Sequence, residues 1–291
     1  MSANGRPDFT EGRRDIVLTG PPRSGTTLTC RLLNDLPDTV ALHEPIPPRR
    51  FARLETEEAV LDGVEDFFRE TRRTILTRKV AISKHAGGQV PDNVYEGTSP
   101  DGGPRAHAGK EKGEIPVTKE LGRDFYLVVK HPAMFTALLP VLAKRFPAYA
   151  IVRNPLSILA SWSSVDHNVR DGHAPAAERY DEGLKRDLAS TDDRTERQLR
   201  LLSWFFERYD ETLPEDHVIR YEEIVATGGG ALSAVIPSAG ALNEPLESKN
   251  LNEAYGRDEM RLLGERLLER EGAYWGFYTR ESVEELLLNL A

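Results

Sequence analysis

A glycine-bounded loop between an apolar strand and an amphipathic helix constrains this chain more than any other feature. Residues 15–19 read Asp-Ile-Val-Leu-Thr, as a short buried strand does, and residues 28–36 carry apolar side chains at helical spacing. Between them, residues 20–27 read Gly-Pro-Pro-Arg-Ser-Gly-Thr-Thr. Backbone N–H groups and a helix N-terminus in such a loop can surround an anionic oxygen. The loop therefore predicts a P-loop-type phosphate-binding site.

The position after the second glycine separates this loop from that of a nucleoside triphosphatase. Such an enzyme has lysine there, which reaches the β- and γ-phosphates of ATP. This chain has Thr26 at that position, and its positive charge, Arg23, lies inside the loop. The pattern favours a nucleotide other than ATP. An ordinary glycine turn before a helix is the alternative interpretation.

Strands and helices alternate along the rest of the chain. Apolar runs predict further strands at 39–43, 125–129, 149–152 and 217–220. Helical spacing of apolar residues predicts helices at 54–78, 133–145, 155–164, 194–212, 258–270 and 281–290. This order indicates an α/β fold, a three-layer α/β/α arrangement with a mainly parallel central sheet, as a single domain over residues 1–291.

Two segments depart from the alternation. Residues 1–12 are polar and predict a flexible tail. Residues 83–119 hold seven glycines and four prolines but no leucine or phenylalanine, so we expect no packed core there. We interpret residues 83–119 as a mobile insertion or a lid.

Charge and cysteine content limit the partners and the compartment. The formal net charge of −9 argues against nucleic acid and anionic membranes as partners. Positive charge is nevertheless concentrated, at +3 over residues 12–34 and +4 over residues 125–165. The single cysteine, Cys30, excludes an internal disulfide framework, and no apolar run is long enough to span a membrane. We therefore expect a cytoplasmic protein.

Two motifs together resemble one enzyme family. Residues 22–27 read Pro-Arg-Ser-Gly-Thr-Thr, which is similar to the 5′-phosphosulfate loop of sulfotransferases that use 3′-phosphoadenosine 5′-phosphosulfate (PAPS). Residues 150–155 read Ala-Ile-Val-Arg-Asn-Pro, with Ser161 eight positions after Arg153, as in the family's 3′-phosphate segment. An arginine at a strand end offers a fork of donors to a dianionic phosphate. The resemblance covers about residues 13–45, 125–165 and 216–226.

The resemblance implies a role for each matching residue. It places Arg23, Ser24, Gly25, Thr26 and Thr27 at the 5′-phosphate and Arg153 and Ser161 at the 3′-phosphate. Lys130, in Val-Lys-His-Pro, would lie near the transferring sulfonate, and Tyr221, in Arg-Tyr-Glu-Glu, beside the adenine. The family's C-terminal Gly-x-x-Gly-x-Trp-Lys loop is missing, and the segment containing Lys249 is the candidate substitute.

Two residues compete as the general base that takes the acceptor's proton. Glu44 follows the strand at 39–43, where tyrosylprotein-type and several bacterial sulfotransferases have a catalytic glutamate. His131 resembles the histidine of cytosolic sulfotransferases, but this chain is one residue shorter between Lys130 and the histidine. A shift of one residue turns a strand side chain to the other face. We therefore prefer Glu44 and keep His131 as the alternative.

The expected reaction transfers a sulfonate from PAPS to an acceptor hydroxyl, or less readily an amine, and releases adenosine 3′,5′-bisphosphate without a metal. The acceptor would be a small molecule, a carbohydrate or a natural product. Phe51, Phe67, Phe68 and Tyr95 could line its site, although a phenylalanine pair at helical spacing more often belongs to a core. A P-loop kinase of a small metabolite and a non-catalytic nucleotide-binding module are the alternative functions.

Overall fold

The structure of the chain is a computed structural model that describes residues 14–93, 95, 103–106 and 111–290. The tail expected at residues 1–12 lies outside these ranges. Within the described residues, no helix is long and apolar enough to cross a membrane.

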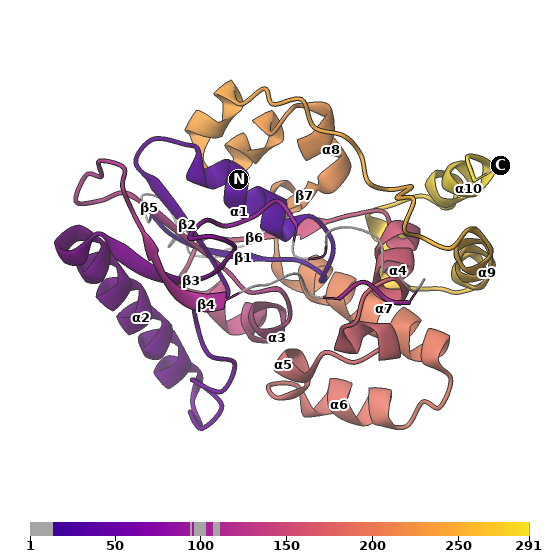
Figure 1. The fold of residues 1–291 in the computed structure, drawn as a ribbon. Helices are drawn as coiled ribbons and strands as arrows, with labels where there is room; N and C mark the ends of the chain where they lie inside the picture. Colours follow the sequence, from indigo (N-terminus) through magenta and orange to yellow (C-terminus); the bar gives the residue numbers. More distant parts are fainter. Residues whose placement is uncertain (1–13, 94, 96–102, 107–110, 291) are drawn as a thin grey trace, which may run out of the picture.

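Five parallel strands form the central sheet (Figure 1). They are β1 (Asp15–Thr19), β2 (Thr39–His43), β5 (Tyr126–Lys130), β6 (Ala148–Val152) and β7 (Val218–Arg220). Across the sheet they run in the order β2-β5-β1-β6-β7, and each neighbouring pair is parallel. The chain completes one side of β1 before it crosses to the other side. In such sheets, ligands bind outside the carboxyl ends of the strands where the order reverses, here beside β1.

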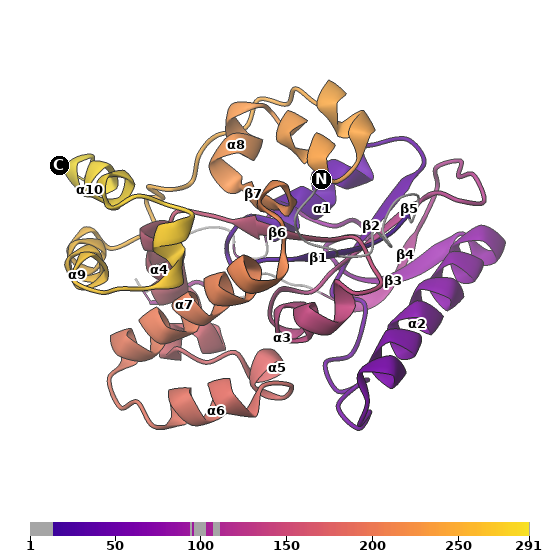
Figure 2. The same ribbon diagram turned by 180° about the vertical axis from the view of Figure 1, so that it is seen from behind.

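Helices cover both faces of this sheet (Figures 1 and 2). The α-helices of the described residues are α1 (Thr26–Asn34), α2 (Glu57–Arg78), α3 (Pro132–Leu142), α4 (Pro155–Ser163), α5 (Pro175–Glu178), α6 (Glu182–Ala189), α7 (Arg194–Thr212), α8 (Tyr221–Ala226), α9 (Arg257–Leu268) and α10 (Arg280–Leu288). Helices α1 and α8 lie on one face, and α2, α3 and α7 lie on the other (Figure 1).

Successive strand residues belong to different hydrophobic cores. In β1, Val17 packs with the core under α2, α3 and α7, whereas Ile16 and Leu18 pack with the core under α1 and α8. This alternation is what a strand buried on both faces requires. The predicted three-layer α/β/α architecture with a parallel sheet is therefore confirmed. Every predicted strand and helix is present, with ends within three residues of those expected.

The expectation that residues 83–119 lack packing is wrong at both ends of that segment. Strands β3 (Val80–His85) and β4 (Glu111–Pro116) pair antiparallel as a two-stranded sheet beside the central one. Side chains of the segment are buried, including Val90, Tyr95 and Ile115. Small β-branched and aromatic residues thus supply the apolar contacts that leucine and phenylalanine supply elsewhere. Whether part of this segment acts as a lid stays a prediction.

Candidate active site

Two glycines shape the loop after β1 because no side chain fits at either position. Gly20 has φ +149°, and a Cβ there would lie 2.3 Å from the Ile151 carbonyl oxygen on β6. Gly25 has φ +97°, and a Cβ there would lie 2.6 Å from the Tyr221 ring. Such conformations and approaches are available only to glycine. The loop is therefore held close to both β6 and α8.

The start of α1 presents free backbone donors to this loop. The first N–H groups of a helix have no partner inside it, and the partial positive charge there favours an anion. Gly25, Thr26 and Thr27 line a cavity of about 420 Å³, within the range of ligand pockets. Ser24 acts differently, since its Oγ donates to the Ile151 carbonyl (2.6 Å) and its N–H donates to Pro21 (3.1 Å). Ser24 shapes the loop, and the amides of Gly25, Thr26 and Thr27 remain for an anion.

Arg153 directly follows β6 and lines the same cavity as the loop. Its Nε donates to Asn250 Oδ1 (2.7 Å), its Nη1 donates to the Arg23 carbonyl (3.1 Å), and its Nη2 donates to the Lys249 carbonyl. Its guanidinium also lies over the Tyr221 ring, 4.8 Å from the centroid. The Lys249 N–H donates to the Tyr221 hydroxyl (3.1 Å). The residues predicted for the 3′-phosphate and the adenine are therefore adjacent, and the segment containing Lys249 lies with them.

Ser161, like Ser24, is a predicted cofactor contact that does not line the cavity. It is fully buried and accepts a hydrogen bond from Arg23 Nε (3.1 Å). A second hydrogen bond joins it to Tyr255. Ser161 therefore fixes the Arg23 side chain.

Among the described residues, Arg23 and Arg153 have no acidic partner. Arg153 is 4% exposed, and no ion pair in the described ranges joins Arg23 or Arg153 to a carboxylate. Burial, with the charges of Arg105 and Arg153, lowers the pKa of Arg23 to about 10. Buried charges are normally paired, so these guanidiniums form a site whose charge an anion would balance.

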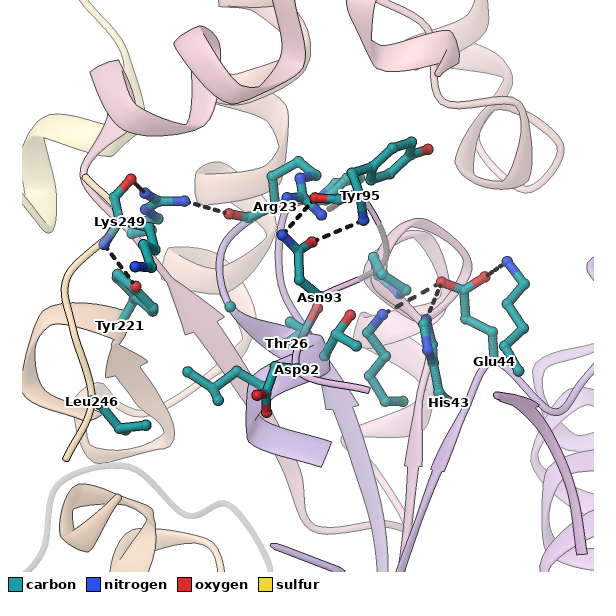
Figure 3. A pocket seen from close by; sticks show the side chains of 18 of the residues that line it. Arg23, Thr26, His43, Glu44, Asp92, Asn93, Tyr95, Tyr221, Leu246 and Lys249 are labelled. Carbon is teal, nitrogen blue, oxygen red and sulfur yellow. Dashed lines mark hydrogen bonds and ion pairs between the residues drawn. The ribbon is translucent and has the colours of Figure 1, made fainter. Parts of the chain in front are cut away.

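Glu44 lies at the end of the cavity opposite Tyr221 and Lys249 (Figure 3), and Lys130, which contacts Glu44, lines the same cavity. His43 and Lys130 are register partners at the carboxyl ends of β2 and β5, which places Glu44 just beyond the sheet edge. Glu44 Oε1 lies 3.4 Å from Lys130 Nζ and accepts from His43 Nε2 (3.2 Å). Its other oxygen, Oε2, lies 2.5 Å from Lys84 Nζ on β3. Four ionisable side chains thus meet where the strands end.

The charges around Glu44 keep its carboxyl group ionised. Burial alone would raise its pKa, but Lys130, His43 and Lys84 outweigh burial and hold the pKa well below the usual range. Burial and the charge of Lys130 lower the pKa of His43 to about 3, so its imidazole is neutral. Burial lowers the pKa of Lys130 as well, although Glu44 opposes that effect. A carboxylate held between lysines can accept a proton once one lysine engages a ligand.

His131 occupies a different environment from the cavity. Its side chain is 3% exposed, and its Nε2 accepts a hydrogen bond from the Ile46 N–H (3.1 Å). Its ring packs edge-on against Phe135 at 5.0 Å, and burial lowers its pKa well below the usual range. The imidazole nitrogen that could take a proton is therefore already used inside the protein. The choice of Glu44 over His131 stays a prediction, and the geometry favours it.

No family model matches the chain, and no curated protein sequence matches it. The chain is similar in structure to a sulfotransferase from Alicyclobacillus acidocaldarius, at 15% identity over 91% of this chain and 99% of that one, with a TM-score of 0.37. It is similar to a sulfotransferase from Mycobacterium tuberculosis, at 14% identity over 89% and 77% of the chains, with a TM-score of 0.37. It is also similar to the sulfotransferase domain of a Synechococcus olefin synthase, at 16% identity over 92% and 86%, with a TM-score of 0.35. TM-scores this low leave the chemistry of the site as the ground for a function.

The aromatic residues proposed for an acceptor site divide between two places. Phe51, Phe67 and Phe68 belong to the hydrophobic core between α2 and the sheet. The core interpretation of the Phe67–Phe68 pair is therefore confirmed, and the acceptor-site position expected for Phe51 is wrong. Tyr95 does line the cavity, and the Arg23 guanidinium lies over its ring at 5.0 Å. Asn93 lies beside Tyr95 at the cavity, where Figure 3 shows both side chains near Arg23.

Sequence reasoning missed two ionisable residues of the site. Lys84 stood in the segment expected to be a mobile insertion, and the structure places it on β3, whose residues 80–85 alternate between more and less buried. Tyr255 is buried behind the loop, where Arg153, Ser161 and Arg23 outweigh burial and lower its pKa. No local pattern marks Tyr255, because only the fold brings it to Arg23. Within the described ranges, no group of three His, Cys, Asp or Glu side chains is placed to hold a metal.

Proposed function

We propose that this protein is a sulfotransferase that moves a sulfonate from PAPS to an acceptor hydroxyl. The observation that carries the proposal is one cavity with a Glu44–Lys130 pair at one end and, at the other, two arginines that no carboxylate of the described residues pairs with. The end with the arginines suits a nucleotide with two separate phosphates. The end with Glu44 and Lys130 suits a sulfonate, which a lysine can stabilise, and a proton, which a carboxylate can accept.

The donor would lie along the cavity from Tyr221 to Lys130. Its 5′-phosphate would take the amides of Gly25 to Thr27 and the charge of Arg23, and its 3′-phosphate would take Arg153. The adenine would lie beside the Tyr221 ring. The two phosphates would balance the positive charges of Arg23 and Arg153, which no carboxylate of the described residues neutralises.

Catalysis would consist of positioning and charge stabilisation, as in phosphoryl transfer. The acceptor oxygen bonds to sulfur while the bond from sulfur to the 5′-phosphate oxygen breaks, and that electron pair leaves with adenosine 3′,5′-bisphosphate. Lys130 stabilises the sulfonate oxygens. Glu44 takes the proton of the acceptor hydroxyl.

A P-loop kinase remains the second candidate for this loop. It would need ATP with Mg²⁺, whereas this chain has Thr26 at the position of the phosphate-binding lysine. A cytoplasmic location stays a prediction from the single cysteine, Cys30.

Ligand-induced thermal stabilisation tests the donor assignment. Adenosine 3′,5′-bisphosphate should raise the melting temperature more than 5′-AMP or ATP with Mg²⁺ does. In Arg153→Gln, affinity for the bisphosphate should fall about 10–100-fold, because a charge-assisted contact is lost, while 5′-AMP should change less. Equal weakening of both nucleotides would remove Arg153 from the 3′-phosphate site, and a preference for ATP with Mg²⁺ would favour the kinase.

A further inference from the structure

Three lysines, Lys130, Lys84 and Lys112, lie around Glu44 and carry one positive charge more than its carboxylate and one transferring sulfonate can balance. Lys130 and His43 contact Oε1, and Lys84 contacts Oε2 at 2.5 Å. Lys130 has a use in the proposed reaction at the sulfonate. Lys84 has none, yet it lines the same cavity.

A second lysine lies directly across the hairpin from the first. Lys84 and Lys112 are register partners in the antiparallel pair β3–β4. Like charges in directly opposite positions destabilise a strand pair. No ion pair in the described part of the chain neutralises Lys112, and its pKa is lowered by burial and by the charge of Lys84. The hairpin therefore keeps an unfavourable pair of cations beside the catalytic carboxylate.

This pair is fixed relative to the site. The His43 N–H donates to Ser83 Oγ (3.0 Å), which joins β3 to the end of β2. Ser83 is fully buried, so the residue next to Lys84 cannot move away without breaking a buried contact. Figure 3 shows Glu44 and His43 at the other side of the cavity from Tyr221 and Lys249. Lys84 lines this acceptor end of the cavity, and Lys112, which is exposed and does not line the cavity, lies beside Lys84 on the neighbouring strand.

We propose that the acceptor carries a carboxylate or a similar oxyanion near its hydroxyl, and that Lys84 and Lys112 bind that group. The inference rests on the proposed function and names the class of acceptor. An anionic group would neutralise the like-charged pair. A neutral acceptor would supply no counter-charge to Lys112 and would leave Lys84 on Glu44.

Binding of this anion also prepares the base. When the acceptor's anionic group takes Lys84, Glu44 Oε2 loses its closest partner and becomes available. The proton of the acceptor hydroxyl then moves to Oε2 as the new bond to sulfur forms. Lys84 would thereby couple acceptor recognition to proton removal.

Matched acceptor pairs test this inference. Labelled PAPS is supplied with 4-hydroxyphenylacetate or its neutral amide, and with methyl glucuronide or methyl glucoside. We expect the wild-type protein to use the anionic member of at least one pair with kcat/KM about tenfold or more above that of the neutral member. Lys84→Met and Lys112→Met should each reduce that ratio toward one, mainly by raising KM for the anionic member.

Controls separate this outcome from damage to the fold. Lys185→Met, at an exposed position on α6, should keep the wild-type ratio. Each variant should bind adenosine 3′,5′-bisphosphate with wild-type affinity. Equal use of both members, preference for the neutral ones, or a ratio unchanged in both lysine variants would overturn the inference. So would absence of transfer to every member by a protein that binds the bisphosphate. Failure of the wild type to bind the bisphosphate would instead overturn the proposed function.

Discussion

Two side chains of the cavity are carried on a left-handed backbone. Arg23 has φ +75° and Glu44 has φ +49°, values that residues other than glycine and asparagine seldom adopt. Each costs on the order of 1–3 kcal/mol, which the surrounding structure has to supply. The left-handed backbone at Glu44 comes directly after β2, and the carboxylate contacts Lys130 and Lys84. Two of the residues assigned to the reaction thus combine a strained backbone with a charged side chain, whereas the other two such backbones, at Asp38 and Lys79, lie outside the cavity.

Removal of the carboxylate charge tests Glu44 as the base. In Glu44→Gln, transfer should fall at least about 10²-fold, because a general base contributes about 10²–10⁴-fold. Binding of adenosine 3′,5′-bisphosphate, measured by calorimetry, should be retained. Glu57→Gln, at an exposed carboxylate on α2, is the matched control and should turn over normally. Near-normal turnover in the Glu44 variant would promote His131 instead.

The buried imidazole of His43 makes stability depend on pH. Its pKa is lowered to about 3 in the folded protein, so between pH 6.5 and 3 the unfolded chain binds a proton that the folded chain does not. Stability should therefore fall as the pH falls through 6.5. For this one group, the loss between pH 7 and pH 5 is about 2 kcal/mol.

Urea unfolding of the wild type and His43→Asn at pH 7, 6 and 5 measures this contribution. The variant should lose less free energy of unfolding than the wild type does over that range. Parallel curves for the two proteins would show that His43 does not titrate as a buried neutral imidazole.

At the scale of elements, the ends of four strands build the site. Strands β1 and β6 bring the loop and Arg153 together, while β2 and β5 bring Glu44 beside Lys130. These strands are predictable from sequence because each is a short, nearly continuous apolar run. Parallel packing with reversal at β1 then places their carboxyl ends on one edge.

The β3–β4 hairpin is a part of the fold that could not be predicted from the sequence. Its strands contain Ser83, Lys84 and His85 in place of an apolar run, and their pairing partner lies 26 or more positions away. Glycine and proline counts over residues 83–119 averaged parts of the two strands with the glycine- and proline-containing sequence between them. The contacts of Lys84 with Glu44 and of Tyr255 with Ser161 depend on this tertiary packing, so no local pattern could predict them.

A methyl group added at Gly25 should displace the loop from α8. In Gly25→Ala, the new Cβ would lie 2.6 Å from the Tyr221 ring at a φ that alanine disfavours, so the loop must shift. We expect affinity for adenosine 3′,5′-bisphosphate to fall at least about tenfold, since contacts of both phosphates are displaced. Gly276→Ala has nothing within 4 Å of the added carbon and is the matched control. Unchanged affinity in Gly25→Ala would remove the loop from the binding site.

At the scale of the whole molecule, charge is distributed unevenly. The chain is acidic overall, at −9, yet its cavity gathers arginines and lysines at both ends. Net acidity disfavours nucleic acid as a partner, while a local basic cavity concentrates a small polyanion. A bisphosphorylated nucleotide with a sulfonate, and an anionic acceptor beyond it, would balance this cavity along its length.

Transfer of ³⁵S-sulfonate from labelled PAPS tests the central claim most directly. The account predicts that label appears in an acceptor hydroxyl as adenosine 3′,5′-bisphosphate is released in equal amount, without added metal, and that Glu44→Gln slows both together. A protein that binds the bisphosphate but moves label to no acceptor, at a rate no higher than hydrolysis in buffer, would contradict the account and leave a nucleotide-binding module in its place.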